Sequence, residues 1–286
     1  MQVTEEQRYL VALDLDGTVV QRGGVIDDEL REAIRSIERA GHQVVISTGR
    51  SVDSALPVIG QLGITPEWIV ACNGAMTLKR DPLGDRGYRH EFVETFSPRE
   101  VLTRIHAHLI SSVYGVETAD GELLYTDDIP ATTLPSRRRH VTFEEMLNTQ
   151  ATRLLIISPS TALERYLAVV DAMGLTRITY GINDIVWLDI APAGVDKQSA
   201  LEAVRARLGI DRSRVFAAGD GHNDVAMLQW ADRHGDAVAM GHAPDEVKAA
   251  AGRVTGAVHE GGLYSALKYR FPKELGFLDA EPGDLS

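Results

Sequence analysis

The stretch Leu10-Val-Ala-Leu-Asp-Leu-Asp-Gly-Thr18 decides the fold, because an apolar run there ends in two acids and a glycine. Such a run is typical of a short buried strand, and we expect Asp14 and Asp16 to start out side by side, since positions two apart on an extended chain face the same way. Gly17 then lets the backbone turn sharply. Two neighbouring carboxylates repel each other unless a cation or a shared proton reduces their charge. Such a pair is suited to act as a nucleophile and an acid/base partner beside a Mg2+ ion. An acidic turn without chemistry explains this stretch alone equally well.

The composition excludes several classes of protein. The 286 residues can form one large domain or two modest ones. With 29 Lys and Arg against 41 Asp and Glu, the net charge is -12, which argues against nucleic acid or an anionic membrane as the main partner. Cys72 is the only cysteine, so we expect no intrachain disulfide and a reducing compartment, with Cys72 as a small apolar residue of a buried strand. Neither a leader nor an apolar run of about 18 residues is visible, so we expect a cytoplasmic protein without a membrane segment.

The first part of the chain alternates between strand and helix patterns. The expected elements after the opening strand are a helix over 27–40, a strand over 43–46, a helix over 52–62 and a strand over 68–72. This alternation predicts right-handed crossovers and a parallel sheet, in which ligands bind beyond the carboxyl ends of the strands. Polar clusters occur at those ends, in Ser47-Thr48-Gly49-Arg50 and in Asn73-Gly74.

A block of different character then interrupts this pattern. The expected elements are strands over 88–95, 113–118, 122–126, 153–157, 177–180 and 185–190, with helices over 97–110 and 161–173. Alternating strands around the turn Asp120-Gly121 are typical of antiparallel pairing. We therefore predict an inserted α+β domain over residues 91–190 and a discontinuous Rossmann-like core formed by residues 1–90 and 191–286.

The first pattern resumes after Pro192. The expected elements are a helix over 198–208, strands over 214–219 and 237–240, a helix over 244–251 and a final strand, turn and helix over 254–269. With these elements in place, the polar residues expected at or near the carboxyl ends of the strands are Asp14, Asp16, Thr48, Asn73, Lys197, Asp220, Asn223 and Asp224. Converging carboxylates require a hard cation such as Mg2+, and a lysine nearby can balance charge and hold phosphoryl oxygens. The inferred reaction is an in-line attack by a carboxylate, giving an aspartyl-phosphate that water hydrolyses.

Five segments in order resemble the motifs of the haloacid dehalogenase superfamily of phosphatases, and within it the Cof-type branch, subclass IIB. They are Asp14-Leu-Asp16-Gly-Thr18, Ser47-Thr48-Gly49-Arg50, Asn73-Gly74-Ala75, Gly194-Val-Asp-Lys197 and Gly219-Asp220-Gly-His-Asn223-Asp224. The resemblance covers nearly the whole chain, with the insertion where that branch carries its cap domain. It implies an α/β fold, a Rossmann-like parallel-sheet core with an inserted α+β cap.

The resemblance also implies roles for these residues. Asp14 is then the nucleophile and a metal ligand, and Asp16 is the general acid/base that lends its main-chain carbonyl to Mg2+. The residues implied to bind the substrate phosphate are Thr48, Gly49, Lys197, Asn73 and Arg50, and those implied at the metal besides the first two acids are Asp220, Asp224 and Asn223. For Arg50 the alternative is an ion pair with a structural acid, and for Asn223 it is the cap of the following helix.

Two features remain outside this pattern. The family usually has Asn in the loop where this chain has His242, and His222 occupies an unspecified position, so we expect both to be solvated loop histidines. The basic run Arg137–Arg139 is expected to be a solvated face, with the alternative that a cap arginine reaches an anionic part of the substrate.

The favoured function is a Mg2+-dependent phosphatase for a small phosphorylated metabolite, such as a sugar phosphate. A phosphomutase-like phosphotransferase is the enzymatic alternative, and a non-catalytic phosphometabolite-binding protein is the alternative from another class. A dehalogenase has no need of Asp16 and the metal acids, and a pure binding protein has no reason to keep a nucleophile beside an acid. The oligomeric state and the substrate's identity stay open.

Overall fold

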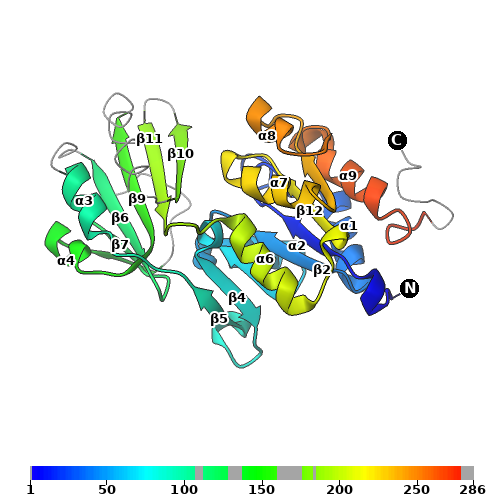
Figure 1. The fold of residues 1–286 in the computed structure, drawn as a ribbon, viewed down its shortest axis with the longest axis horizontal. Helices are drawn as coiled ribbons and strands as arrows, with labels where there is room; N and C mark the ends of the chain where they lie inside the picture. The colour runs from blue at the N-terminus through cyan, green and yellow to red at the C-terminus, as the bar shows by residue number, and fades with distance from the viewer. Residues whose placement is uncertain (1, 107–111, 128–136, 160–175, 183–184, 278–286) are drawn as a thin grey trace.

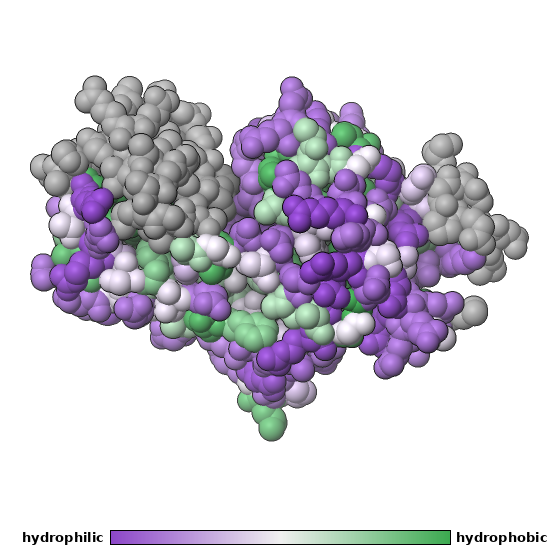
Figure 2. Space-filling model, in the orientation of Figure 1, coloured by the Kyte–Doolittle hydropathy of each residue, from purple (hydrophilic) through white to green (hydrophobic). Residues whose placement is uncertain are grey.

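The computed structural model describes residues 2–106, 112–127, 137–159, 176–182 and 185–277, which form two lobes, each built on one sheet (Figure 1). The predicted helix over 161–173 and the last residues of the helix predicted over 97–110 lie outside the described residues. The sheets have eight and six strands, and the predicted class, an α/β core with an inserted α+β cap, is confirmed. In the described residues no helix is both long and apolar enough to cross a membrane, and hydrophilic side chains dominate the face of the core seen in Figure 2.

The core sheet is mostly parallel. Its strands are β1 (Leu10–Leu13), β2 (Gln43–Ser47), β3 (Trp68–Ala71), β4 (Met76–Arg80), β5 (Tyr88–Val93), β12 (Val215–Gly219), β13 (Asp236–Ala239) and β14 (Arg253–Val254), in the order β14-β13-β12-β1-β2-β3-β4-β5. The opening strand β1 lies in the middle, paired in parallel with β2 on one side and β12 on the other. The strand order reverses beside β1, which is where α/β sheets leave a crevice for ligands.

Helices cover both faces of the core sheet because β1 is apolar on both sides. Val11 and Leu13 pack toward α1 (Asp28–Arg39), α2 (Val52–Leu62) and α9 (Gly262–Arg270). Leu10 and Ala12 pack toward α6 (Lys197–Leu208), α7 (Val225–Asp232) and α8 (Asp245–Ala249). Every residue of β1 is fully buried, and each large one contributes about 1.5–3 kcal/mol by that burial. The strand that carries the first acids is therefore held rigidly.

The core sheet ends in an antiparallel hairpin that the sequence pattern did not predict. After β3 the short turn η2 (Cys72–Gly74) reverses the chain into β4, which pairs antiparallel with β3 and β5. All three turn residues have positive φ, 51° at Cys72, 53° at Asn73 and 103° at Gly74. Cys72 is buried, as expected, but in this turn instead of a strand. Because β5 belongs to the core sheet, the expected domain boundary at residue 90 falls inside a strand.

The second sheet, with its helices, is the cap. Its elements are α3 (Arg99–His106), β6 (Val113–Thr118), β7 (Leu123–Tyr125), β8 (Arg138–His140), α4 (Phe143–Leu147), β9 (Ala151–Pro159), β10 (Thr176–Ile182) and β11 (Ile185–Ala191), with the strand order β10-β11-β9-β6-β7-β8. One face packs its apolar residues, among them Tyr114, Leu154 and Leu188, against α3 and α4. The opposite face meets the core, as described below. The remaining short helical turns are η1 (Glu5–Gln7), η3 (Asp85–Gly87), η4 (Arg212–Arg214), η5 (His222–Asp224) and η6 (Val258–Glu260).

Gly74→Ala is expected to destabilise the protein, by about 1–3 kcal/mol for the strained backbone and more for the contact. At φ 103° an added Cβ would lie 2.1 Å from the main-chain oxygen of Asp196, the residue that precedes α6. Urea unfolding measures the change. Gly209→Ala is the matched control, because Gly209 also has positive φ (64°) but its Cβ would meet nothing within 4 Å. Equal losses in the two variants would show that the contact with Asp196 does not matter.

Candidate active site

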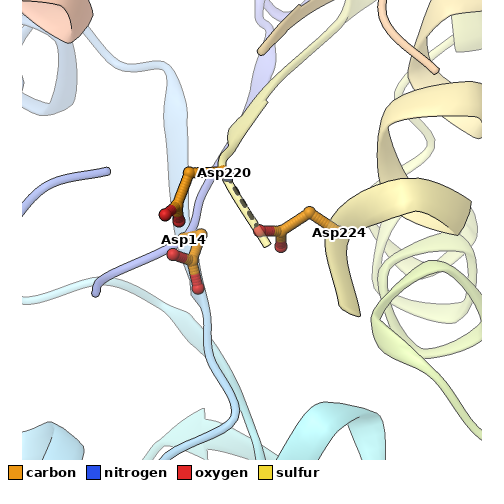
Figure 3. Close-up of side chains that lie close together, drawn as sticks. All are labelled: Asp14, Asp220 and Asp224. Carbon is orange, nitrogen blue, oxygen red and sulfur yellow. Dashed lines mark hydrogen bonds between the residues drawn. The ribbon is translucent and has the colours of Figure 1, made fainter. Parts of the chain in front are cut away.

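Three carboxylates meet at the carboxyl edge of the core sheet (Figure 3). Asp14 follows β1, Asp220 follows β12, and Asp224 ends η5, the turn that follows. One carboxylate oxygen of each acid lies within 4.8 Å of the chosen oxygens of the other two. Asp14 and Asp220 are brought together because β1 and β12 are paired strands. The Asp14 N–H extends this pairing by one hydrogen bond, since it donates to the Ala218 oxygen at 3.1 Å. The sequence predicted all three acids at this edge.

Lys197 lies between two of these acids. It is the first residue of α6, is fully buried, and places Nζ 2.6 Å from Asp14 Oδ1 and 2.7 Å from Asp224 Oδ1. Burial opposes its charge, but the attraction of Asp14 and Asp224 raises the pKa of Lys197 above its ordinary value. The side chain is therefore a cation. The Asp196 carboxylate accepts from Ser199 N and caps α6, which fixes the start of the helix and with it the lysine.

One lysine does not neutralise three carboxylates. Burial raises the pKa of Asp14 well above its ordinary value, with Asp224 and Asp220 adding to the rise against the attraction of Lys197. Burial and the charge of Asp224 likewise raise the pKa of Asp220. Carboxylates this close together stay ionised more easily when a cation lies among them. The donor set therefore fits a hard cation such as Mg2+.

The remaining acid oxygens are held by specific donors. Asp224 Oδ2 accepts from the N–H groups of Asp220 and Gly221, each at 3.0 Å. Asp220 accepts from Thr18 Oγ1 at 3.3 Å and lies 3.2 Å from His242 Nε2. These contacts hold Asp220 and Asp224 in fixed orientations.

His242 is an exposed loop histidine, as expected, but it also contacts one of the acids. Its Nδ1 accepts from the Val258 N–H at 3.4 Å, which leaves Nε2 as the ring nitrogen that donates to Asp220. His222 also follows the expectation: it is largely exposed and pairs with Glu246 at 3.3 Å. Nothing in the sequence spacing of His242 pointed to Asp220, because the two lie in loops after different strands.

Asp16 has other surroundings than Asp14. Its side chain is 57% exposed, and it is not one of the three clustered acids. Arg50 binds it with two parallel contacts, Nε to Oδ2 at 2.7 Å and NH2 to Oδ1 at 2.5 Å. The alternative weighed for Arg50, an ion pair with an acid, is thus what the geometry shows, and the acid is Asp16. Among the described residues, the hydrogen bonds that Arg50 donates go to Thr48, Asp16 and Ser54, not to the three clustered acids.

The loops after β2 and β3 lie against each other. Thr48 is buried; its Oγ1 accepts from the Arg50 N–H at 3.1 Å and its main-chain oxygen accepts from the Asn73 N–H at 3.1 Å. Gly49 is pressed against Asn73, since an added Cβ would lie 2.9 Å from Asn73 Oδ1. That oxygen accepts from Asn223 Nδ2 at 3.0 Å. The amide nitrogen of Asn223 therefore contacts a residue expected to bind phosphate, and not one of the three acids.

The basic run Arg137–Arg139 lies at the edge of the cap, in and beside β8. Arg137 pairs with Asp120 at 3.0 Å, and Arg139 pairs with Glu145 at 2.7 Å and with Glu122 at 3.7 Å. All three arginines are exposed. This is the solvated face expected from the sequence. Arg137 also meets the core, but only by its main chain, since its N–H donates to Asp53 Oδ2 at 3.4 Å. The cap arginine whose side chain contacts the core main chain is Arg153, to which no motif pointed.

Comparison with known proteins places this geometry in a family. A family model described as haloacid dehalogenase-like hydrolase matches residues 11–267. The chain is 30% identical over 279 residues to the 5-amino-6-(5-phospho-D-ribitylamino)uracil phosphatase YitU of Bacillus subtilis, spanning 93% of this chain and 99% of the relative. It is 27% identical over 265 residues to the pyridoxal phosphate phosphatase YbhA of Escherichia coli, spanning 86% and 93%.

A solved structure shows the same fold. A sugar phosphatase of subclass IIB of the haloacid dehalogenase superfamily superposes with a TM-score of 0.75 at 22% identity, over 91% of this chain and 98% of that one. The family model spans both parts of the core and the cap between them, and the five predicted motifs lie at the edge where the acids and Lys197 meet. The chain therefore belongs to the haloacid dehalogenase-like hydrolases, as a phosphatase of their Cof-type branch.

Proposed function

We propose that the protein is a Mg2+-dependent phosphatase that hydrolyses a small phosphorylated metabolite through an aspartyl-phosphate on Asp14. The observation that carries the proposal is the buried contact of Lys197 with Asp14 and Asp224, within a cluster that also includes Asp220. A purely structural ion pair needs one carboxylate for one lysine. Two further acids at the same point destabilise the fold, so their presence indicates a function such as binding a metal and a phosphoryl group.

Mg2+ would be held by Asp14, Asp220 and Asp224, with the main-chain oxygen of Asp16 completing the set that the family resemblance implies. When bound, Mg2+ offsets the negative charge of the phosphoryl oxygens and of the carboxylates around it. The donor set supports this choice, since hard carboxylate oxygens favour Mg2+ over softer metals. Asn223 would contribute its amide carbonyl oxygen to the shell, because its amide nitrogen is engaged by Asn73.

In the first half of the reaction, a carboxylate oxygen of Asp14 attacks phosphorus in line with the leaving oxygen. The new Asp14 oxygen–phosphorus bond forms while the bond from phosphorus to the leaving oxygen breaks. Lys197 keeps Asp14 in place for this attack and favours its ionised form, because its ammonium contacts Oδ1 directly. Thr48, Gly49 and Asn73 bind the phosphoryl oxygens through hydroxyl, N–H and amide groups.

Asp16 moves the protons. It gives a proton to the leaving alcohol, then takes one from the water that attacks phosphorus, which releases phosphate and restores Asp14. Its side chain is exposed to solvent, as expected of a group that must contact both the leaving group and a water molecule. Arg50 holds Asp16 by both oxygens, so we assign Arg50 to orienting this acid, besides any contact with phosphate.

We further propose that residues 94–191 form the cap domain that covers the substrate and excludes water during the first transfer. The two relatives named above act, by their names, on a phosphorylated ribitylaminouracil and on pyridoxal phosphate. Both are small phosphate monoesters, which supports a substrate of that class, with sugar and polyol phosphates as the first to test. The acidic chain and its lone cysteine support a cytoplasmic location and no nucleic-acid partner.

Asp14→Asn is expected to lower phosphate release by at least about 10⁴-fold, because an amide cannot act as the nucleophile. Release of inorganic phosphate is measured from a panel of sugar, polyol and vitamin phosphates, with Mg2+ and with EDTA. EDTA is expected to abolish the activity of the wild type. Asp28→Asn, an exposed acid in the first turn of α1, serves as the matched control and should keep full activity.

The same panel separates the alternative functions. Tight binding of one ester without phosphate release would contradict the phosphatase and favour a binding protein. A product in which the phosphoryl group has moved within the sugar, again without free phosphate, would favour a phosphotransferase. Full activity in EDTA would contradict the role of Mg2+.

Lys197→Met is expected to destabilise the fold by about 3–5 kcal/mol in the absence of Mg2+, because it leaves Asp14 and Asp224 buried without their cation. The unfolding free energy in urea, measured with EDTA, gives the change. Lys248→Met in α8, a lysine only partly buried, is the control and should change stability little. A loss no larger than that of the control would mean that the lysine does not balance the acids.

A further inference from the structure

The face of the cap sheet that lies against the core carries a buried cluster of charges. Glu117 on β6 is paired in register with Arg153 on β9, and Asp189 comes from the neighbouring strand β11. Glu117 and Asp189 are 1% and 3% exposed, and the Arg153 side chain 16%. The cluster lies on the opposite face from the apolar residues that pack on α3 and α4. Burial of three charges at a contact between two lobes calls for an explanation.

Arg153 links the cap acids to the core. Its Nε lies 3.0 Å from Asp189 Oδ2, and its NH1 lies 3.7 Å from Glu117 Oε2. The same NH1 donates to the main-chain oxygen of Gly49 at 3.0 Å. Gly49 directly follows Thr48 in the loop to which we assign phosphate binding. A guanidinium fork is suited to hold a carboxylate and a carbonyl at once in a fixed geometry.

Asp189 makes the second link. Its Oδ2 accepts from Asn73 Nδ2 at 3.2 Å, and Asn73 in turn accepts from Asn223 in the loop that carries Asp220 and Asp224. A third contact beside these is the Cys72 thiol, which donates to Glu117 Oε1 at 3.4 Å. The cap acids and Arg153 thus contact two loops of the proposed site, those after β2 and β3, and the orientation of the Asn73 amide is set by a cap residue.

We propose that Arg153 and Asp189 of the cap are positioning residues of the phosphatase, which hold Gly49 and Asn73 in the geometry that binds the phosphoryl group. In this arrangement the phosphate site is complete only while the cap rests on the core. The inference rests on the proposed function, since it assigns residues to the same site. Neither residue is required to touch the substrate.

Arg153→Gln and Asp189→Asn are expected to raise KM by about 10²-fold, because small displacements of binding groups cost that much. The effect is expected to be the same for phosphate esters with unrelated leaving groups, and the inhibition constant of inorganic phosphate should rise by a similar factor. The measurements use the full-length protein with Mg2+. If Arg153→Gln folds poorly, Asp189→Asn, which keeps the shape of the side chain, carries the same expectation.

Two arginine variants separate positioning from stability. Arg139→Gln removes an exposed cap arginine with its ion pairs and should leave KM unchanged. Arg153→Lys keeps the charge but not the fork, so it should restore the melting temperature while KM stays raised. Full recovery of KM in Arg153→Lys would overturn the positioning role, because charge alone would then suffice.

Other outcomes also overturn the proposal. An unchanged inhibition constant for inorganic phosphate would contradict it. A rise in KM that depends on the leaving group would also contradict it, because Arg153 and Asp189 would then recognise that group. Asp189 Oδ1, which has no hydrogen-bond donor among the described residues, is the atom that would do so. If the wild type releases no phosphate from any ester, the proposed function fails instead, and this result is distinct from an active wild type with unaffected variants.

Glu117 supplies an independent readout through pH. Burial raises its pKa from 4.5 to about 7, against the attraction of Arg153. The groups that face it are Arg153 from β9, Asp189 from β11, Cys72 from η2 and Asp53 from α2. When the cap leaves the core, Glu117 regains water and its ordinary pKa. Closing the cap therefore takes up a proton between about pH 4.5 and 7.

The sign of the pH effect follows from this uptake. The contribution of Glu117 to closure is fully present below pH 4.5 and is lost as pH rises to about 7, so KM should increase with pH by up to tenfold per unit in that window. Glu117→Gln should remove this part of the pH dependence of KM. Other groups titrate in both the wild type and the variant, so their effects cancel when the two profiles are compared. Identical KM profiles for the two proteins would show that closure of the cap on Glu117 does not control phosphate binding.

Discussion

The contact of Lys197 with Asp14 and Asp224 is the constraint on which the rest of the site depends. It joins the end of β1 to the start of α6 and to the turn after β12, three places far apart in the chain. The lysine is buried only because two carboxylates receive its charge, and the carboxylates tolerate burial only because the lysine is there. The acid charge that Lys197 leaves unbalanced is the feature that supports our proposal of a divalent cation at this site.

Much of the core could be predicted because its signals are local. The apolar run of β1, the alternation of strands and helices and the acids at strand ends placed Asp14, Asp220 and Asp224 at one edge, as the structure shows. The hairpin of β3 and β4 was missed because three successive residues, Cys72, Asn73 and Gly74, take positive φ. The pair Asn73-Gly74 is typical of a tight turn, but no feature of the sequence indicates positive φ at Cys72 before it. The pairing of Asp16 with Arg50 was foreseen only as an unassigned ion pair.

The contacts between cap and core could not be predicted from the sequence. Glu117, Arg153 and Asp189 look like ordinary charged residues of strands, and their positions carry no spacing that marks a site. Their role depends on which face of the sheet they occupy and on how that face meets the core. The same holds for His242, whose neighbour Asp220 is set by the packing of two loops. Side chains that act across an interface are specified by tertiary structure alone.

The position of the cap within the chain has a consequence for biosynthesis. Leu10 of the central strand pairs with Val215, so the ribosome must produce about two hundred further residues before the sheet can close. Asp14, Thr48 and Asn73 emerge before the cap, whereas Lys197, Asp220 and Asp224 emerge after it. During synthesis Asp14 therefore remains without its counterion Lys197, and the cap can fold first as a unit. Chaperones that shield the half-made sheet would meet the apolar faces of β1, β2 and β3 during that interval.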